Sequence, residues 1–197
     1  MAERIANIYQ FKITLKDFKP KIWRRIQVPE NYSFYDLHVA IQDAMGWEDY
    51  HLHQFDIMNP KTGEKVFIST LDNEVFHDVI EEHKAKIAQY FSISNNKASY
   101  EYDFGDGWEH EIILEEILPA NADIKYPQCI AGKNACPPED CGGIPGYEYL
   151  LEIMANPQHE EHAERMRCLG GKFMPKEFDP QLVKFDNPKE RWKKSVY

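Results

Sequence analysis

Two segments near the start of the chain alternate between apolar and polar residues, and this alternation constrains the fold most. They are residues 8–15 (IYQFKITL) and 22–28 (IWRRIQV). Because successive side chains of a strand point to opposite faces, a period of two predicts strands with one buried face. The residues between them include Asp17 and Pro20, so we expect a turn that joins the two strands as a hairpin.

A predicted helix and two more predicted strands follow this hairpin. Ser33 and Asp36 stand at the spacing of a capping box, and Gly46 suits the position just after a helix. Residues 51–58 and 65–69 are typical of strands. The order strand, strand, helix, strand, strand is that of a β-grasp. It predicts an α+β fold with a mainly antiparallel or mixed sheet and helices on one face.

The remaining two thirds of the chain mix regular and irregular segments. Apolar residues near helical spacing predict a helix over 72–91, and two alternating runs predict a second hairpin, 100–104 with 108–114. A stretch rich in Pro, Gly and Cys predicts a long loop over 119–145, with helices from 147 and from 157. We expect one domain over 1–197, with a body at 5–118, the loop at 119–145, and C-terminal helices and a wrapping tail at 146–197.

Composition and charge narrow the class of protein. The 197 residues carry 23 Lys and Arg against 33 Asp and Glu, a net charge of −10. A chain this acidic is a poor DNA-coating protein, because phosphate contacts need clustered cations. No apolar run approaches the roughly 20 residues of a membrane span, and residues 1–21 lack the apolar core of a signal peptide. We therefore expect a cytoplasmic protein that contacts neither membrane nor nucleic acid.

The charge is unevenly distributed along the chain. Residues 1–28 hold seven basic side chains against two acidic ones, whereas residues 101–116 hold seven acids and no Lys or Arg. Such asymmetry marks either a surface for a partner or neighbouring strands of complementary charge. The second interpretation is the more common one.

Five strings of the sequence together resemble one family. They are PKIWRR (20–25), AMGW (44–47), HLHQF (51–55), YDFGDGWEH (102–110) and ACPPEDCGG (135–143). The chain resembles the Ri-plasmid open-reading-frame-three-like family from Ile8 to about Phe185. This resemblance implies an α+β domain with no established activity, in a family whose members are loosely labelled TnpR resolvase-like or passengers of insertion elements. In many members Val stands at the position of Cys141, so no metal or disulfide role of this cysteine is implied.

The residues themselves argue against recombinase catalysis. The first serine, Ser33, suits a helix cap better than a nucleophile, and the proline-containing tail has no helix-turn-helix pattern.

Three cysteines of the long loop form one candidate metal site. Cys129, Cys136 and Cys141 are separated by six and then four residues, unlike the Cys-x-x-Cys pairs of common zinc sites. Three thiolates and a histidine would bind zinc. The alternatives are free thiols in a reducing compartment, or a disulfide between Cys129 and Cys136.

Histidines and carboxylates of the predicted strands form a second candidate. His51 and His53 are two apart on one predicted strand, so they point to the same face. Imidazoles and carboxylates suit Zn, Fe or Mn if the strands approach, and buried structural histidines are the alternative. The candidate functional cluster is His51, His53, Asp103, Asp106, Trp108 and His110.

Three functions remain open from the sequence. The first is a non-catalytic binding or adaptor domain without cofactor, whose acidic hairpin and Cys/Pro loop contact a protein partner. The loop residues concerned are Pro137, Pro138, Glu139, Asp140, Gly142 and Gly143. The second is a metal-dependent enzyme that uses zinc or another divalent metal at His53 and His110 with Asp103 or Asp106. The third is an accessory of mobile-element DNA transactions that uses the basic first hairpin and tail.

Overall fold

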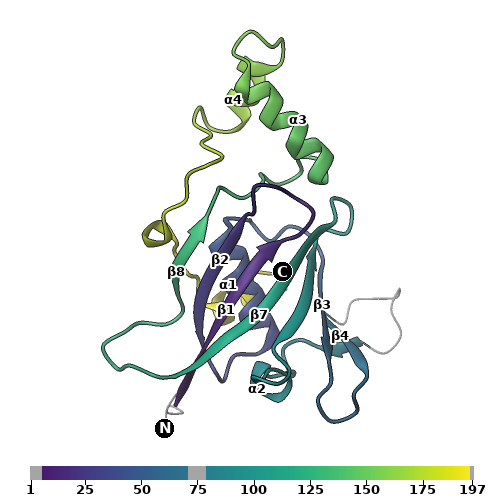
Figure 1. Ribbon diagram of the computed structural model, residues 1–197, viewed down its shortest axis with the longest axis vertical. Coiled ribbons are helices and arrows are strands. Elements are labelled where there is room, and N and C mark those ends of the chain that lie inside the picture. The colour runs from purple at the N-terminus through teal and green to yellow at the C-terminus, as the bar shows by residue number, and fades with distance from the viewer. Residues whose placement is uncertain (1–5, 71–78, 196–197) are drawn as a thin grey trace.

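One sheet of eight strands forms the centre of the computed structural model, which describes residues 6–70 and 79–195 (Figure 1). The strands are β1 (Asn7–Leu15), β2 (Trp23–Pro29), β3 (His53–Met58), β4 (Lys65–Ser69), β5 (Val79–Glu81), β6 (Lys97–Tyr102), β7 (Trp108–Pro119) and β8 (Gln128–Lys133). The helices are α1 (Phe34–Met45), α2 (Ile87–Tyr90), α3 (Gly143–Ala155), α4 (His162–Cys168) and α5 (Pro188–Ser195).

The order of strands in the sheet is β5-β4-β3-β6-β7-β1-β2-β8. All neighbours pair antiparallel except β4 and β5, which are parallel. Hairpins β1–β2, β3–β4 and β6–β7 therefore account for the local pairing, while β1 pairs with the distant strand β7. This mixed, mainly antiparallel sheet and the opening order of elements confirm the predicted α+β fold.

Helix α1 covers one face of the central strands (Figure 1). The Ser33 side chain accepts from the Asp36 backbone N–H at 3.1 Å, and the Asp36 carboxylate accepts from the Ser33 N–H at 2.8 Å, which is the predicted capping box. Gly46 ends the helix at a φ of 92°, a left-handed conformation that glycine adopts without strain. The stripe of α1 packs with fully buried Phe11, Ile13 and Phe55 of the sheet.

Opposite charges of the two hairpins meet on β7, β1 and β2, which are consecutive strands of the sheet. Lys16 Nζ lies 2.5 Å from Glu109 Oε2, and Arg25 Nε lies 2.5 Å from Glu115 Oε2. The basic first hairpin and the acidic second hairpin thus adjoin, which confirms the cross-strand interpretation of the uneven charge.

Two sequence predictions about the middle of the chain are wrong. The helix predicted over 72–91 is replaced at 79–81 by strand β5 and survives only as the four-residue α2, while 72–78 lie outside the described residues. The loop predicted over 119–145 contains β8, which pairs with β2. Both errors have one cause: β5 and β8 are short, and each is defined by a partner strand rather than by its own pattern.

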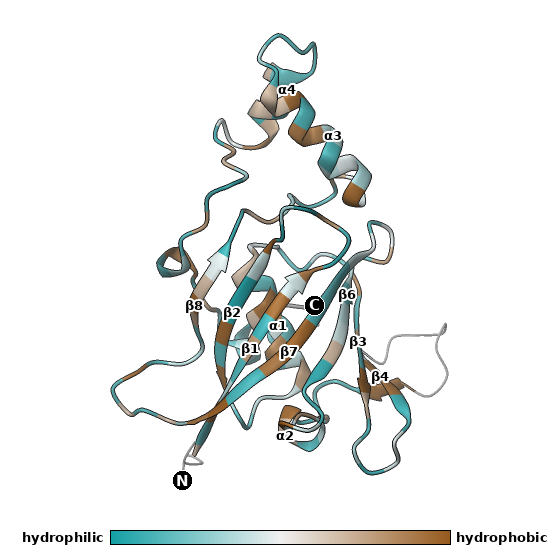
Figure 2. Ribbon diagram, in the orientation of Figure 1, coloured by the Kyte–Doolittle hydropathy of each residue, from teal (hydrophilic) through white to brown (hydrophobic). Residues whose placement is uncertain are grey.

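Helices α3 and α4 lie beyond one end of the sheet, and α5 returns to contact α1 (Figure 1). Hydropathy follows this layout, with hydrophobic segments mainly on strands and on α3 and hydrophilic residues on most connecting loops (Figure 2). Among the described helices, none has both the length and the apolar character to cross a membrane.

Candidate functional site

The connection between α1 and β3 brings histidines and carboxylates together in two places. We call His38, Asp49, His53, Glu82 and Tyr100 the buried cluster. We call the second group, His51 with two aspartates described below, the open cluster. Both clusters use residues of one short segment, 49–53. Asp49 and His53 turn inward and belong to the buried cluster, whereas His51, which lies between them in sequence, belongs to the open cluster.

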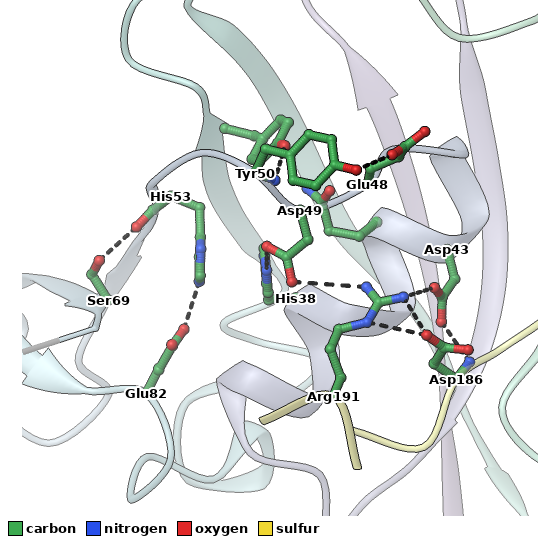
Figure 3. Close-up of polar contacts among 12 residues, drawn as sticks. His38, Asp43, Glu48, Asp49, Tyr50, His53, Ser69, Glu82, Asp186 and Arg191 are labelled. Carbon is green, nitrogen blue, oxygen red and sulfur yellow. Dashed lines mark hydrogen bonds and ion pairs between the residues drawn. The ribbon is translucent and has the colours of Figure 1, made fainter. Parts of the chain in front are cut away.

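Two imidazole rings stack face to face in the buried cluster. The ring centroids of His38 on α1 and His53 on β3 are 3.4 Å apart, with an interplanar angle of 6°. His38 Nε2 lies 2.8 Å from Asp49 Oδ1, and His53 Nε2 lies 2.6 Å from Glu82 Oε2. Each ring is therefore paired in its own plane with one carboxylate (Figure 3).

The hydrogen bonds around Tyr100 define the tautomer of His38. The Gln42 amide donates to the Tyr100 hydroxyl oxygen at 2.9 Å, so the hydroxyl proton is left to donate to His38 Nδ1, also at 2.9 Å. His38 is then neutral, with its proton on Nε2 facing Asp49. In agreement, burial and the neighbouring His53 lower the pKa of His38.

Both carboxylates of the buried cluster are held as anions. Burial alone would raise the pKa of each, but the adjacent histidines reverse this and lower the pKa of Asp49 and of Glu82. Glu82 is completely buried, so its negative charge depends on the His53 partner. Ligand atoms of His38, Asp49 and His53 also lie within 4.8 Å of one another, but the Nε2 atom of each histidine is already paired with a carboxylate. In the buried cluster, each histidine and its carboxylate thus share a proton through a hydrogen bond.

Helix α5 places Arg191 at one side of this cluster (Figure 3). Arg191 Nη2 lies 2.5 Å from Asp43 Oδ1 and 2.8 Å from Asp186 Oδ2, and Nη1 lies 3.8 Å from Asp49 Oδ2. The guanidinium thus compensates the negative charge of carboxylates on α1 and on the α1–β3 connection.

The open cluster consists of His51, Asp103 and Asp140. His51 Nε2 lies 3.0 Å from Asp140 Oδ1 and 3.6 Å from Asp103 Oδ2, and the three ligand atoms lie within 4.8 Å of one another. Although the first contact is short, its alignment is not that of a hydrogen bond, and no hydrogen bond from the described residues reaches Nε2. Two ligands of a tetrahedral zinc ion lie about 3.3 Å apart, and the two distances bracket that value.

The carboxylate of Asp103 is oriented by backbone groups. Asp103 Oδ1 accepts from the N–H groups of Gly105 at 2.9 Å and Asp106 at 3.3 Å, which leaves Oδ2 toward His51. Such fixing of one carboxylate oxygen is typical of metal ligands. The Asp140 side chain is 70% exposed, so solvent reaches the cluster.

The loop motif predicted from the sequence delivers Asp140 to this place. Trp47 Nε1 donates to the Pro137 carbonyl at 3.0 Å, and the Gly142 N–H donates to Asp106 Oδ2 at 3.1 Å. A Cβ on Gly143 would come within 2.5 Å of the Asp106 carbonyl oxygen, so only glycine permits this approach. The loop is thereby anchored to the turn of the acidic hairpin.

A pocket of about 280 Å³ adjoins the open cluster. The loop supplies Pro138, Glu139, Asp140 and Cys141 to its wall, and α3 and α4 supply mainly apolar side chains with Arg165. Glu139 Oε1 accepts from the Tyr102 hydroxyl and from the Glu48 N–H, whereas Glu139 Oε2 is buried without a hydrogen bond from the described residues. Asp140 thus belongs to both the ligand set and the pocket.

Asp106 adjoins the open cluster through its hydrogen bond to Asp103, whereas His53, Trp108 and His110 lie apart from it. His53 belongs to the buried cluster, and the Tyr100 ring lies between His53 and His110, with centroids 6.0 and 5.6 Å away. His110 is fully buried beside Trp47, and burial lowers its pKa to about 4. Trp108 is also fully buried, within the hydrophobic core. The structure therefore does not bring His53 and His110 to one metal.

The cysteines do not meet in a ligand group within residues 6–70 and 79–195, and all four are free thiols. Burial raises the pKa of Cys129 and of Cys136, and raises that of Cys141 to about 12. Neutral thiols of this kind are poor metal ligands, since the thiolate is the binding form.

Sequence reasoning missed His38, Asp49 and Glu82. One signal was available, because His38 and Gln42 are polar residues four apart on the buried side of α1. Asp49 and Glu82 carry no such signal, since they come from connections that only the folded chain brings together.

These features define an α+β protein with an eight-stranded mixed sheet and two histidine–carboxylate clusters at the α1–β3 connection. The chain belongs to the plasmid pRiA4b ORF-3-like family, whose model matches residues 7–182. It is 34% identical over 167 residues to the uncharacterized protein y4hQ of Sinorhizobium fredii, covering 84% of this chain and 82% of that one. A crystal structure of the protein of unknown function MM3350 from Methanosarcina mazei is similar with a TM-score of 0.86 and 47% identity, covering 92% of this chain and all of that one.

Proposed function

We propose that the chain binds a divalent transition-metal ion at the open cluster and presents it to a small molecule in the adjoining pocket. The observation that carries this proposal is His51 Nε2, which faces two carboxylate oxygens at 3.0 and 3.6 Å without a hydrogen bond from the described residues. One imidazole and two carboxylates are a common donor set for Zn, Mn or Fe.

The arrangement is that of a catalytic rather than a structural metal. Structural zinc sites are closed by four protein ligands, whereas catalytic ones keep a position for water or substrate. His51, Asp103 and Asp140 supply three ligands, and the exposed Asp140 side leaves the fourth position to solvent or to a molecule in the pocket. A metal-bound water at that position would supply hydrolytic or hydration chemistry near neutral pH.

Elemental analysis of untagged protein, purified without chelators, tests this proposal. We expect a near-stoichiometric transition metal in the wild type and a loss of it in His51→Ala and Asp103→Asn. Asparagine suits the second change, because Asp103 has a φ of 54° and asparagine tolerates a left-handed backbone. The matched control is His159→Ala with His162→Ala, a histidine pair outside the open cluster, which should retain the metal.

Two further variants separate this site from the other candidate ligand sets. Metal that persists in His51→Ala but disappears in Cys136→Ala would move the site to the cysteine loop and contradict the proposal. Metal lost only in His53→Ala with His110→Ala would move it to the strands. In a cobalt-substituted protein, nitrogen and oxygen ligands give no sulfur-to-metal charge-transfer band, so its appearance would also contradict the open cluster.

A binding or adaptor role is the second candidate, and an exposed apolar group favours it. Tyr50 is 70% exposed, Leu52 is 51% exposed and Phe104 is 38% exposed. Leu52 and Phe104 lie on neighbouring segments, because the Asp103 N–H donates to the Leu52 carbonyl at 2.9 Å. The Tyr50 hydroxyl donates to Glu48, and the Tyr50 N–H donates to the Tyr102 hydroxyl, which in turn donates to Glu139, so this group suits a basic protein segment with an apolar anchor. A partner that is lost in Leu52→Ser but retained in Leu182→Ser, where the side chain is 75% exposed, would support this role.

A role in DNA transactions ranks third. Lys16 and Arg25 of the basic hairpin are paired with carboxylates of β7 rather than left for phosphates. Retention on duplex DNA at low salt that declines steeply with added salt would support this role, and no retention would contradict it.

A further inference from the structure

Helix α5 is attached to the body of the protein through an arginine and an aromatic ring. Arg191 is bound by Asp43 and Asp186 and faces Asp49. The Trp192 ring lies 3.8 Å from the His83 ring and 5.4 Å from the Tyr35 ring. Helices of eight residues are unstable alone in water, so these contacts hold α5 in its helical form.

The surface that receives these two side chains belongs to the body. Asp43 and Tyr35 lie on α1, Asp49 lies on the α1–β3 connection, and His83 follows β5. All four lie within residues 7–182 matched by the family model, whereas α5 begins at Pro188, outside that range. The receiving surface thus lies within the matched range, and α5, which occupies this surface, lies beyond the end of that range.

The charge of this surface calls for a cation. The Asp43 side chain is 6% exposed, and burial raises its pKa even with Arg191 adjacent. Asp49 is 17% exposed and is already shared with His38. Without a guanidinium, two partly buried carboxylates would remain close together with no compensating charge, which is unfavourable.

We propose that this surface is a docking site for a segment of another protein in which an arginine is followed by an aromatic residue, and that α5 is the internal occupant which such a segment displaces. The carboxylates of Asp43 and Asp49 would bind the guanidinium, and the rings of Tyr35 and His83 would bind the aromatic side chain. Arginine and aromatic residues are the side chains most enriched at the centres of protein interfaces. This inference is independent of metal binding at the open cluster.

A labelled peptide with the sequence of residues 184–197 serves as the probe, and its fluorescence anisotropy is measured against the full chain. In the wild type, tethered α5 competes at an effective concentration on the order of 1 mM, so the peptide should bind weakly. In Arg191→Ala, the internal occupant is weakened, and we expect the apparent affinity for the peptide to rise at least about tenfold. Addition of Asp43→Asn to this variant should remove the gain.

Changes in the peptide test which side chains are recognised. A peptide of the same composition, scrambled except for the adjacent Arg and Trp, should bind the Arg191→Ala chain nearly as well as the original. A peptide with Lys and Ala at these two positions should bind at least about tenfold more weakly. Equal binding of both peptides, or no saturable binding by the Arg191→Ala chain, would overturn the proposal.

Two measurements cover the remaining outcomes. Circular dichroism establishes that Arg191→Ala is folded; if it is not, Trp192→Ala replaces it and the same gain is expected. Size-exclusion chromatography over a range of wild-type concentrations tests a second copy as the occupant. A dimer that exchanges α5 between chains, and that Arg191→Ala abolishes, would overturn the assignment to a different protein.

Discussion

The buried and open clusters contain the same kinds of side chain but differ in how these are paired. In the buried cluster each histidine is aligned with its own carboxylate, at 2.8 and 2.6 Å. In the open cluster one histidine faces two carboxylates at 3.0 and 3.6 Å and is aligned with neither. A carboxylate aligned with each histidine indicates a role in stability, whereas a histidine aligned with no carboxylate beside solvent indicates a place for a ligand.

The largest difference between the clusters should appear on removal of a carboxylate. Glu82→Ala leaves a buried imidazole without its partner and should lower the free energy of unfolding by about 3–5 kcal/mol. Asp140→Asn removes the charge of a mostly exposed side chain, and asparagine tolerates the φ of 52° at this position, so it should change the free energy of unfolding by less than about 0.5 kcal/mol. Urea denaturation monitored by tryptophan fluorescence measures both.

The neighbouring Glu81→Ala is the matched control for Glu82→Ala. Glu81 pairs with Lys84 near the surface, where an ion pair contributes about 0–1 kcal/mol. Equal effects of the two glutamate variants would contradict the stabilising role of the buried cluster.

Zinc should stabilise the protein through the open cluster alone. A ligand that binds only the folded state adds about 2.7 kcal/mol at one hundred times its dissociation constant. We expect this gain in thermal denaturation of the wild type, and its loss in His51→Ala. Because Glu82 does not contribute to the open cluster, Glu82→Ala should still be stabilised by zinc, although it is less stable than the wild type. Loss of the zinc-dependent gain in Glu82→Ala would indicate that the two clusters form one site.

The Tyr100 hydroxyl connects α1 to the sheet within the buried cluster. Tyr100→Phe leaves both the Gln42 amide and His38 Nδ1 unsatisfied in the interior and should cost about 1–3 kcal/mol. Tyr149→Phe removes a hydroxyl that bonds Glu161 at the surface and should have almost no effect. Chemical denaturation of the two variants compares them directly.

The buried cluster should also make stability depend on pH. The pKa of Asp49 is lower in the folded protein than in the unfolded chain, so its contribution is present above about pH 4, near the unfolded value. The contribution is lost as pH falls through the lower folded value. Each unit of pKa difference corresponds to about 1.4 kcal/mol. The difference in stability between wild type and Asp49→Asn should therefore shrink below pH 4, and a constant difference would contradict the assignment.

The sequence was sufficient for elements whose signal is local. Strands β1, β2, β3, β4, β6 and β7 and helix α1 were predicted from alternation, caps and turns, and the hairpins followed from the turns between them. The short strands β5 and β8 were not predicted, because β8 is defined by its pairing with β2, about one hundred residues earlier. The pairing partner, rather than the pattern of the segment, determines such strands.

The candidate site shows the same division between local and distant information. His51 and Asp103 were selected because histidine and aspartate are typical ligands, and Asp140 was noted only within the loop motif. Their convergence depends on Gly143, which lets the loop approach the acidic turn, and no spacing in the sequence encodes that contact. The pairing of His53 with Glu82, rather than with His110, likewise follows from the position of Tyr100 between the strands.

The position of β1 between β2 and β7 has a consequence for how the chain acquires its structure. The Gln10 amide donates to Glu115 Oε2 across a separation of 105 residues. Proteins with many such nonlocal contacts fold slowly, because a long loop must close before the contacts compensate its entropy. While a nascent chain emerges, the first hairpin is complete on one side only, and the backbone groups of β1 that later pair with β7 stay available to other strands. Until β7 has been synthesised, this unpaired edge can add strands of other chains and is therefore a site of aggregation.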